Sequence, residues 1–189
     1  MAILKVAQLG NPVLRKKGEP VPVEDITSEP IQRLIDDMID TMREYSGVGL
    51  AAPQVHESLQ ILTLEAEGNA RYSDVPEIEL MVLVNPKIEK FSNEMDEDWE
   101  GCLSLTDIWG KVRRAIAITV SAYDRDGNPL TIEAEGFFAR VLQHEIDHVY
   151  GKVFVDRMTD MSTLSFGRER MRYSAHEDED ATEEVDDQS

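Results

Sequence analysis

Residues 143–148 read Gln-His-Glu-Ile-Asp-His, and they lie within residues 137–150, whose apolar spacing predicts a helix. On such a helix His144 and His148 are one turn apart on the same face, so both imidazoles can bind one cation. Glu145 follows about 100° around the helix, close enough to handle the proton of a water held by that cation. The pattern also arises by chance, so ordinary core or surface histidines are the alternative interpretation.

A catalytic metal usually has three protein ligands and an open fourth position, and Cys102 is the candidate third ligand. This single cysteine lies in residues 100–104, Glu-Gly-Cys-Leu-Ser, where the glycine lets the backbone approach another group closely. A lone cysteine is more often a small buried hydrophobic residue, and that alternative stays open. A thiolate ligand suits Fe(II) as well as Zn(II). One thiol cannot form an internal disulfide and fits a reducing cytoplasm.

Residues 47–54, Gly-Val-Gly-Leu-Ala-Ala-Pro-Gln, form a run of small side chains after a predicted helix. The end of that helix explains Gly47 but does not explain Gly49. Small residues in series suit a wall on which the backbone of a ligand lies against protein backbone. Gln54 would then offer an amide donor to a polarised carbonyl oxygen.

The remaining pattern predicts one further helix and several strands. Apolar spacing predicts a helix over residues 31–45, with Ser28 as its N-cap, Pro30 in its first turn and Gly47 as its stop. The second helix, residues 137–150, should stop at Gly151. Strands are predicted at residues 59–64, 80–85, 116–123 and 131–134, with a hairpin turn at 124–129 and a surface loop at 66–77.

Length and charge limit the classes of protein that the chain can belong to. Its 189 residues fit one α+β domain, residues 1–173. A formal net charge of −19 argues against broad contact with nucleic acid or with anionic membranes. Residues 176–189 contain eight carboxylates and no Lys or Arg, so residues 174–189 are predicted to be a disordered acidic tail. The amino terminus carries neither a secretory signal nor a transit segment.

The three motifs, at residues 47–54, 100–104 and 143–148, together resemble the peptide deformylase family. The family patterns are Gly-x-Gly-x-Ala-Ala-x-Gln, Glu-Gly-Cys-x-Ser and a Gln-His-Glu helix that ends in Asp-His, and all three are complete here. The resemblance extends from the start of the chain to about residue 160. It implies a compact α+β domain of antiparallel strands packed around a central metal-binding helix.

The resemblance also implies a reaction, the removal of the formyl group from the amino-terminal formylmethionine of new peptides, with release of formate. The implied metal is Fe(II), with Zn(II), Ni(II) or Co(II) as substitutes, and its ligands would be Cys102, His144 and His148. Glu145 would take a proton from water and pass it to the departing amine. The backbone N–H of Leu103 and the amide of Gln54 would stabilise the developing charge on the formyl oxygen.

By the same resemblance, an apolar pocket would receive the methionine side chain, and the peptide backbone would pair along residues 48–49. Trp109 replaces an arginine that is common in relatives, and it would act as a hydrophobic lid or as a stacking surface for the second peptide residue. The implied substrate-binding residues are Val48, Gly49, Glu100, Gly101, Trp109, Phe137 and Val141.

The implied partners are formylated nascent peptides. Bacterial relatives often end in a basic helix that docks on the ribosome, whereas this chain ends in the acidic tail, so weaker docking is expected. A monomer is expected, without a membrane or direct nucleic-acid partner. The location implied is the cytoplasm of a bacterial-type cell, with an organelle as the alternative.

Three other functions are consistent with parts of the sequence. A His-Glu-x-x-His zinc peptidase would use Glu169 as its third ligand, but it leaves residues 100–104 unexplained. A metal-stabilised binding protein would normally need four protein ligands and no base such as Glu145. A degenerate deformylase would bind nascent peptides without turnover, and Trp109 mildly favours it.

Overall fold

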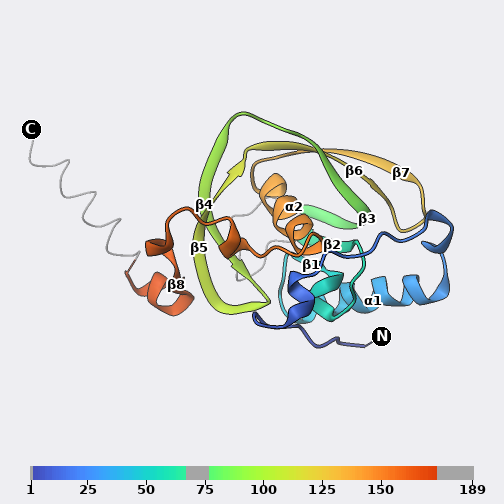
Figure 1. Cartoon of the computed structure of the whole chain (residues 1–189), viewed down its shortest axis with the longest axis horizontal. Coiled ribbons are helices and arrows are strands. Elements are labelled where there is room, and N and C mark those ends of the chain that lie inside the picture. The colour runs from blue at the N-terminus through green and yellow to red at the C-terminus, as the bar shows by residue number, and fades with distance from the viewer. Residues whose placement is uncertain (1, 67–76, 174–189) are drawn as a thin grey trace, which may run out of the picture.

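The structure is a computed structural model that describes residues 2–66 and 77–173 (Figure 1). The predicted acidic tail, residues 174–189, lies outside the described residues, as does most of the predicted loop at 66–77. The described part combines two antiparallel sheets with α-helices of 14 and 16 residues and a helical segment at 167–173, so the predicted α+β class with antiparallel strands is confirmed. None of its helices has the length and apolar character needed to cross a membrane.

The strands form a five-stranded sheet, in the order β1-β2-β3-β6-β7, and a three-stranded sheet, in the order β4-β5-β8. Every pairing within the two sheets is antiparallel. The strands are β1 Gly49–Ala51, β2 Ile61–Ala66, β3 Ile78–Phe91, β4 Met95–Cys102, β5 Leu105–Ala115, β6 Ala117–Tyr123, β7 Pro129–Glu135 and β8 Ser165–Phe166. The helices are α1 Glu29–Glu44 and α2 Gly136–Val149, with short 3-10 turns at Pro12–Arg15, Val23–Asp25, Ala52–Val55, Phe154–Asp156 and Met161–Thr163.

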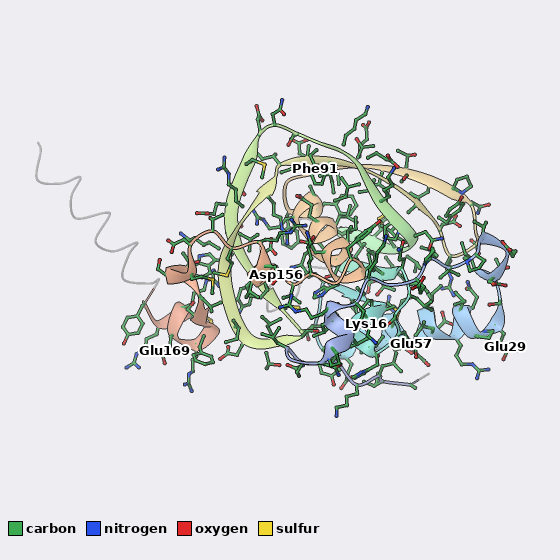
Figure 2. The ribbon with its side chains drawn as sticks, in the orientation of Figure 1. Lys16, Glu29, Glu57, Phe91, Asp156 and Glu169 are labelled. Atoms are coloured by element: carbon green, nitrogen blue, oxygen red, sulfur yellow. The ribbon has the colours of Figure 1, made fainter. Side chains whose placement is uncertain are left out.

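Helix α2 lies between the two sheets (Figure 1). It touches every strand of the five-stranded sheet and also β5 of the other sheet. All of its residues from Ala139 to Val149 are buried, including the two histidines. Side chains fill the space around it, whereas Phe91 and Glu29 lie at the periphery (Figure 2). The helix that carries the histidines is therefore held from both sides.

Helix α1 forms as its apolar spacing predicts, because Ile35, Met38, Ile39 and Met42 all face the core under β1 and β2. Ser28 precedes it and Pro30 lies in its first turn, as expected. The helix ends at Glu44 with Tyr45 as its C-cap, two residues before the predicted stop at Gly47.

The left-handed residue after α1 is Ser46, with φ of 51°. A Cβ on Gly47 would be 2.9 Å from Leu103 Cδ1, so a larger residue there would push the Leu103 side chain aside. Helix α2 ends before Gly151 as expected, where φ is 74° and a Cβ would collide with the backbone of Arg15.

The sequence pattern missed one large element, the hairpin of β4 and β5 that carries residues 100–104. Residues 95–98 of β4 are all exposed and mostly acidic, so the strand has no alternation of apolar side chains to reveal it. The pattern also shortened β3, which the structure extends from Ile78 to Phe91. Asn85 interrupts β3 with a φ of 54° and a shift of register, which explains the early end of the predicted strand.

Candidate metal centre and active site

Three predicted ligands, Cys102, His144 and His148, converge at one point. Cys102 ends β4, and the two histidines lie on α2. The Sγ of Cys102 is 3.2 Å from His148 Nε2, and the two Nε2 atoms of the histidines are 3.3 Å apart. The three donor atoms all lie within 4.8 Å of one another. Both imidazoles are nearly buried, with exposures of 9% and 1%. Two segments far apart in the sequence thus place one sulfur and two nitrogens around a common centre.

The orientation of His144 is fixed by Glu100. His144 Nδ1 donates to Glu100 Oε2 over 2.9 Å, which leaves Nε2 turned toward Cys102 and His148. Burial alone would raise the pKa of the Glu100 carboxyl, but hydrogen bonds from His144 and Arg114 hold that pKa far below its usual range. Glu100 is therefore an anion that fixes one imidazole.

The electrostatics of the three donors favour the form of Cys102 that binds metal. Burial would raise the pKa of this thiol, but the charge of His148 and hydrogen bonds from both histidines bring it well below its ordinary value. Burial would lower the pKa of His144, yet its hydrogen bonds to Cys102 and Glu100 raise it well above the ordinary value. A thiolate beside two imidazoles is the donor set of a thiophilic divalent cation.

One buried polar atom also fits a site that holds a cation and water. Glu145 Oε2 has no hydrogen-bond partner among the residues that the structure describes. Buried polar atoms are rarely left without partners, so this atom marks a place where water belongs. The donor set and this carboxylate oxygen together fit a divalent metal with room for water.

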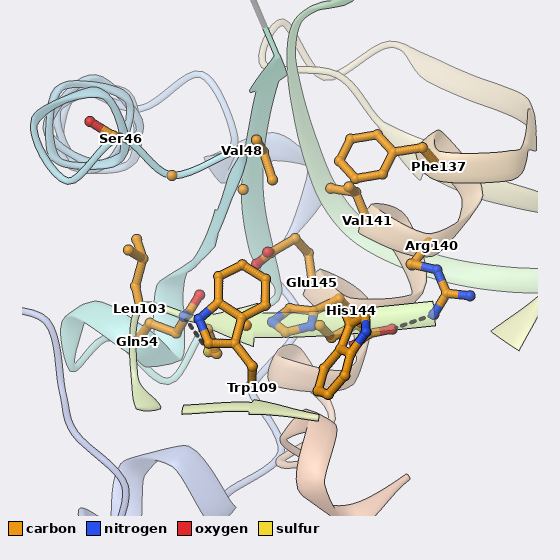
Figure 3. Close-up of a pocket in the computed structure, with 16 residues that line it drawn as sticks. Ser46, Val48, Gln54, Leu103, Trp109, Phe137, Arg140, Val141, His144 and Glu145 are labelled. Atoms are coloured by element: carbon orange, nitrogen blue, oxygen red, sulfur yellow. Dashed lines mark hydrogen bonds and ion pairs between the residues drawn. The ribbon is translucent and has the colours of Figure 1, made fainter. Parts of the chain in front are cut away.

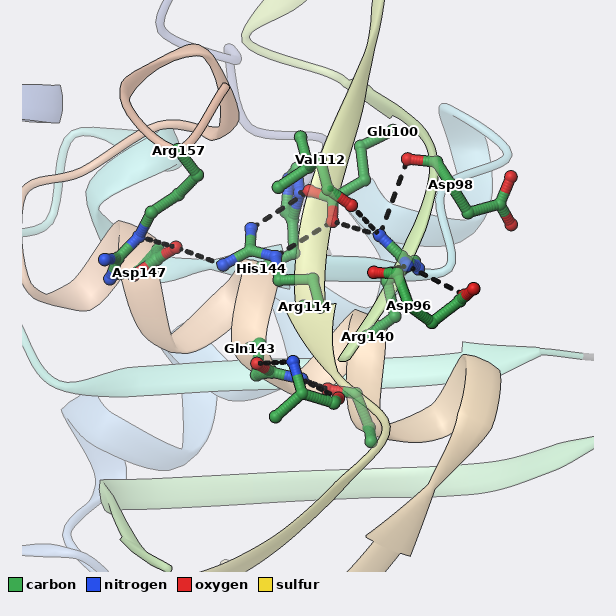
Figure 4. Close-up of polar contacts among 12 residues, drawn as sticks. Asp96, Asp98, Glu100, Val112, Arg114, Arg140, Gln143, His144, Asp147 and Arg157 are labelled. Carbon is green, nitrogen blue, oxygen red and sulfur yellow. Dashed lines mark hydrogen bonds and ion pairs between the residues drawn. The ribbon is translucent and has the colours of Figure 1, made fainter. Parts of the chain in front are cut away.

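Behind the ligands lies a network that we call the inner wall, defined as Glu100, Arg114, Arg140, Asp147 and Arg157, of which all but Arg157 are buried (Figure 4). Arg114 donates to both oxygens of Glu100, at 2.9 and 3.0 Å, and to Asp147 at 2.6 Å. Arg140 donates a hydrogen bond of 3.1 Å to Glu100, and Arg157 donates a hydrogen bond to Asp147. Every charge in this network therefore has a partner of opposite sign.

Glu145, the predicted base, is 4% exposed and lies against β1. A Cβ on Gly49 would be 2.5 Å from Glu145 Oε1, so a larger residue at that position would displace the Glu145 carboxylate. This contact supplies the reason for Gly49 that the sequence did not. Burial raises the pKa of the Glu145 carboxyl, although the charges of the two histidines act in the opposite direction.

Gln54 points its amide nitrogen toward the metal ligands. Its Oε1 accepts from the backbone N–H of Ala51 over 2.8 Å, which fixes the orientation of the amide. Its Nε2 lies 3.3 Å from Ser104 Oγ and 3.6 Å from Cys102 Sγ. The donor side of this amide is thus turned to the place where the three ligands meet.

A pocket opens in front of these groups (Figure 3). It contains the predicted substrate-binding residues, with Phe137 and Val141 on α2 facing Val48 beside β1. The structure adds Ser46, Trp99 and Arg140, which the sequence did not suggest. The lining residues that the sequence predicted are Val48, Gly49, Gln54, Glu100, Gly101, Cys102, Leu103, Trp109, Phe137, Val141, His144 and Glu145.

Sequence reasoning also missed residues that support the site from behind. Ser104 is completely buried and accepts from Gln54, and Phe154 stacks on His144 at 6.3 Å between ring centroids. Arg114 could have been found only with β5 known, because the alternation of that strand turns it inward beside Val112. Glu169, the third ligand of the peptidase alternative, pairs with Arg168, and it is absent from the metal-binding group found among the described residues.

Comparisons with known proteins agree over most of the chain. The family model described as polypeptide deformylase matches residues 3–163. Peptide deformylase 1 of Bordetella pertussis is 43% identical over 165 residues, covering 87% of this chain and 91% of the relative. Peptide deformylase 2 of a Nostoc species is 43% identical over 164 residues, covering 86% and 90%.

Solved structures give the same result. A class I type b peptide deformylase from Acinetobacter baumannii, crystallised with Met-Ala-Ser bound, superposes with a TM-score of 0.81 at 40% identity and covers 83% of this chain and 99% of its own. A peptide deformylase from Synechococcus elongatus in complex with actinonin gives a TM-score of 0.75 at 33% identity, covering 86% and 82%.

Proposed function

The chain belongs to the polypeptide deformylase family and is a metal-dependent hydrolase that removes the formyl group from formylmethionine peptides, and we propose that Cys102, His144 and His148 hold its metal. The observation that carries this proposal is the convergence of one sulfur and two imidazole nitrogens within 4.8 Å. The Cys/His/His set leaves a coordination position for water, as catalytic sites do. A structural site would normally be closed by a fourth protein ligand.

We propose that the metal is Fe(II), with Zn(II), Ni(II) or Co(II) as substitutes. One thiolate and two imidazoles are compatible with each of these ions. When bound, the cation supplies Lewis-acid chemistry, polarising the formyl carbonyl and acidifying a water molecule. The Glu100 carboxylate supports this binding, because it holds His144 with Nε2 directed to the centre.

Glu145 is the proposed proton carrier. Its Oε2 is buried without a partner among the described residues, so it is free to accept a proton from water and donate it to the departing amine. Burial raises the pKa of its carboxyl, which brings a carboxylate closer to the pH at which acid–base catalysis works best. Gly49 leaves the space that this side chain occupies.

Gln54 and Leu103 are the proposed stabilisers of charge on the formyl oxygen. The Gln54 carbonyl is held by Ala51, so its Nε2 faces the ligands with a fixed orientation. The Leu103 backbone N–H follows Cys102 directly in the chain. Donors that are oriented before the reaction stabilise developing charge without reorganising, which is their main advantage over water.

The pocket suits a methionine side chain and a peptide backbone. Val48, Phe137 and Val141 give it an apolar end, where the formylmethionine side chain would pack. β1 is the terminal strand of the five-stranded sheet, so residues 48–49 offer an edge to an added peptide strand. The Acinetobacter baumannii relative was crystallised with Met-Ala-Ser bound, and a peptide of that kind is the expected ligand here.

We further propose residues 1–173 as the catalytic domain of a monomeric, cytoplasmic enzyme. Residues 176–189 add eight negative charges, which would repel the phosphates of ribosomal RNA and weaken docking on the ribosome. A pelleting assay measures this association with ribosomes. Unchanged ribosome association after deletion of residues 176–189 would contradict it.

The function is tested by formate release from formyl-Met-Ala-Ser, with protein prepared anaerobically and loaded with Fe(II). We expect stoichiometric formate and Met-Ala-Ser. Casein digestion serves as the control for the peptidase alternative. Cleavage of casein without formate release would overturn the proposal, and tight metal binding with neither product would favour a binding protein.

A further inference from the structure

Both tryptophans of the chain, Trp99 and Trp109, line the pocket and share one cation. The guanidinium of Arg170 lies 4.6 Å from the ring centroid of Trp99 and 5.1 Å from that of Trp109. These distances are within the range of favourable cation–π contacts. Arg170 belongs to residues 167–173, a helical segment that follows β8. We call Trp99, Trp109 and Arg170 the outer wall.

The Trp109 indole is enclosed by two glycines as well as by Arg170. A Cβ on Gly101 would be 2.9 Å from the indole, and a Cβ on Gly167 would be 2.8 Å from its Nε1. Trp109 is also the register partner of Ser165, where β8 pairs with β5. The ring is therefore fitted between β4 and the segment 165–173.

The charge of Arg170 is met by aromatic faces. Its Nε is buried and has no hydrogen-bond partner within the described ranges, 2–66 and 77–173. By contrast, Arg114 and Arg140 of the inner wall each contact carboxylates. Arg170 stacks on both indole rings. Its removal should therefore make the positions of Trp99 and Trp109 less fixed.

The outer wall lies where a peptide would leave the pocket. The apolar end at Phe137 and Val141 suits the first side chain, and the edge of β1 at residues 48–49 suits the backbone. Trp109 lines the same pocket (Figure 3). Residues after the formylmethionine must then pass between the β1 edge and the outer wall.

We infer that Arg170, in the segment 165–173, positions Trp109 and Trp99 to contact the peptide beyond its first residue. This inference rests on the proposed function of the same site. The ring contacts of the Arg170 guanidinium are with the two indoles, so its loss acts on affinity for longer peptides and leaves the chemical step unchanged. Arg170 is a positioning residue, and the indoles make the contact.

The test compares Arg170→Gln with the matched control Arg168→Gln in the metal-loaded full chain. Arg168 lies in the same segment with a 77% exposed side chain, and its guanidinium lies 5.7 Å from the Phe166 ring. Loss of a cation–π contact predicts that KM for formyl-Met-Ala-Ser rises about three- to tenfold in Arg170→Gln. The value of kcat, and the KM for formyl-Met alone, should stay within about twofold of the unmodified enzyme. The control should change neither.

Tryptophan fluorescence measures peptide binding and so does not depend on turnover. Its signal comes only from Trp99 and Trp109, because the chain has only these two tryptophans. Titration with Met-Ala-Ser should change the emission of the unmodified protein, and Arg170→Gln should bind this peptide more weakly. Arg170→Lys, which keeps the cation, should restore part of the affinity. Equal binding of Met-Ala-Ser by Arg170→Gln and the unmodified protein would overturn the inference, as would equal losses for formyl-Met and formyl-Met-Ala-Ser. Absence of formate release from the unmodified protein would instead overturn the proposed function.

Discussion

The inner and outer walls of the pocket are held in place by different forces. In the inner wall, Glu100 and Arg114 are each 5% exposed, and the Glu100 oxygens accept from two arginines and a histidine. In the outer wall, Trp99 and Trp109 are half-buried and are held by packing and by the guanidinium of Arg170. Charge–charge pairs in a buried, fully paired network fix the positions of side chains firmly. Partly exposed stacking on aromatic rings fixes them less firmly.

The difference matches what each wall has to do. The inner wall sets the direction of His144 Nε2. This matters because a small error in the position of a reacting group lowers the reaction rate strongly. The outer wall faces peptide side chains that vary from one substrate to the next. A rigid support for the chemistry and an adaptable surface for the variable part of the substrate can therefore coexist in one pocket.

The largest expected effect comes from Glu145, the proposed proton carrier. Glu145→Gln should lower kcat for formate release by about 10²–10⁴-fold, the usual contribution of a general acid–base group. Metal content and thermal stability should be retained, because the buried carboxylate has no partner among the described residues to lose. Steady-state kinetics, elemental analysis and thermal unfolding measure these three quantities. Undiminished turnover in this variant would remove Glu145 from the mechanism.

Next in size is the loss of Arg114, which tests whether the inner wall is held by charge. Arg114→Met leaves Glu100 and Asp147 without one of their cations, and breaking a buried pair typically costs about 3–5 kcal/mol. The free energy of unfolding from urea titrations should fall by that amount. Metal affinity should also fall by about 10–100-fold, because Glu100 no longer fixes His144 as firmly.

Arg125→Met is the matched control for that change. Arg125 pairs with Asp36 near the surface, where both side chains are more than a third exposed, so its loss should cost about 0–1 kcal/mol. Equal losses of stability in the two variants would show that the buried network has no special role.

The smallest effect is expected for Trp109→Ala, in the outer wall. The ring is half-buried at the edge of the molecule, so metal content should stay unchanged, and the unfolding free energy should fall by about 1 kcal/mol. KM for formyl-Met-Ala-Ser should rise by about tenfold with little change in kcat, as loss of a substrate contact predicts. A large fall in kcat with KM unchanged would assign Trp109 to the chemical step and blur the distinction between the walls.

Local patterns predicted the parts of the molecule that depend on neighbouring residues. The spacing of apolar residues gave both α-helices, and the separation of His144 and His148 by four residues placed them on one face of α2. Strand β4 was not predicted, because its solvent-facing residues are mostly acidic and show no strand pattern. Only its pairing with β5 defines it. The need for Gly49 became clear only when Glu145, almost one hundred residues later, was found against it.

Contacts between distant segments account for the rest. The pairing of Arg114 with Asp147 joins β5 to α2, and the stacking of Arg170 on Trp99 joins the carboxyl-terminal segment to β4. Neither pair has a fixed spacing or a motif, because each depends on how the two sheets enclose α2. The ligands could be inferred from their motifs, whereas the groups that hold them required the fold.

The most direct test of the account is the first coordination shell of the metal. X-ray absorption of the zinc-loaded protein should show one sulfur at about 2.3 Å and two imidazole nitrogens at about 2.0–2.1 Å. In Cys102→Ala the sulfur should disappear and the zinc content should fall. A shell without sulfur in the unmodified protein, or full zinc occupancy in Cys102→Ala, would contradict the assignment of Cys102, His144 and His148 as the ligands.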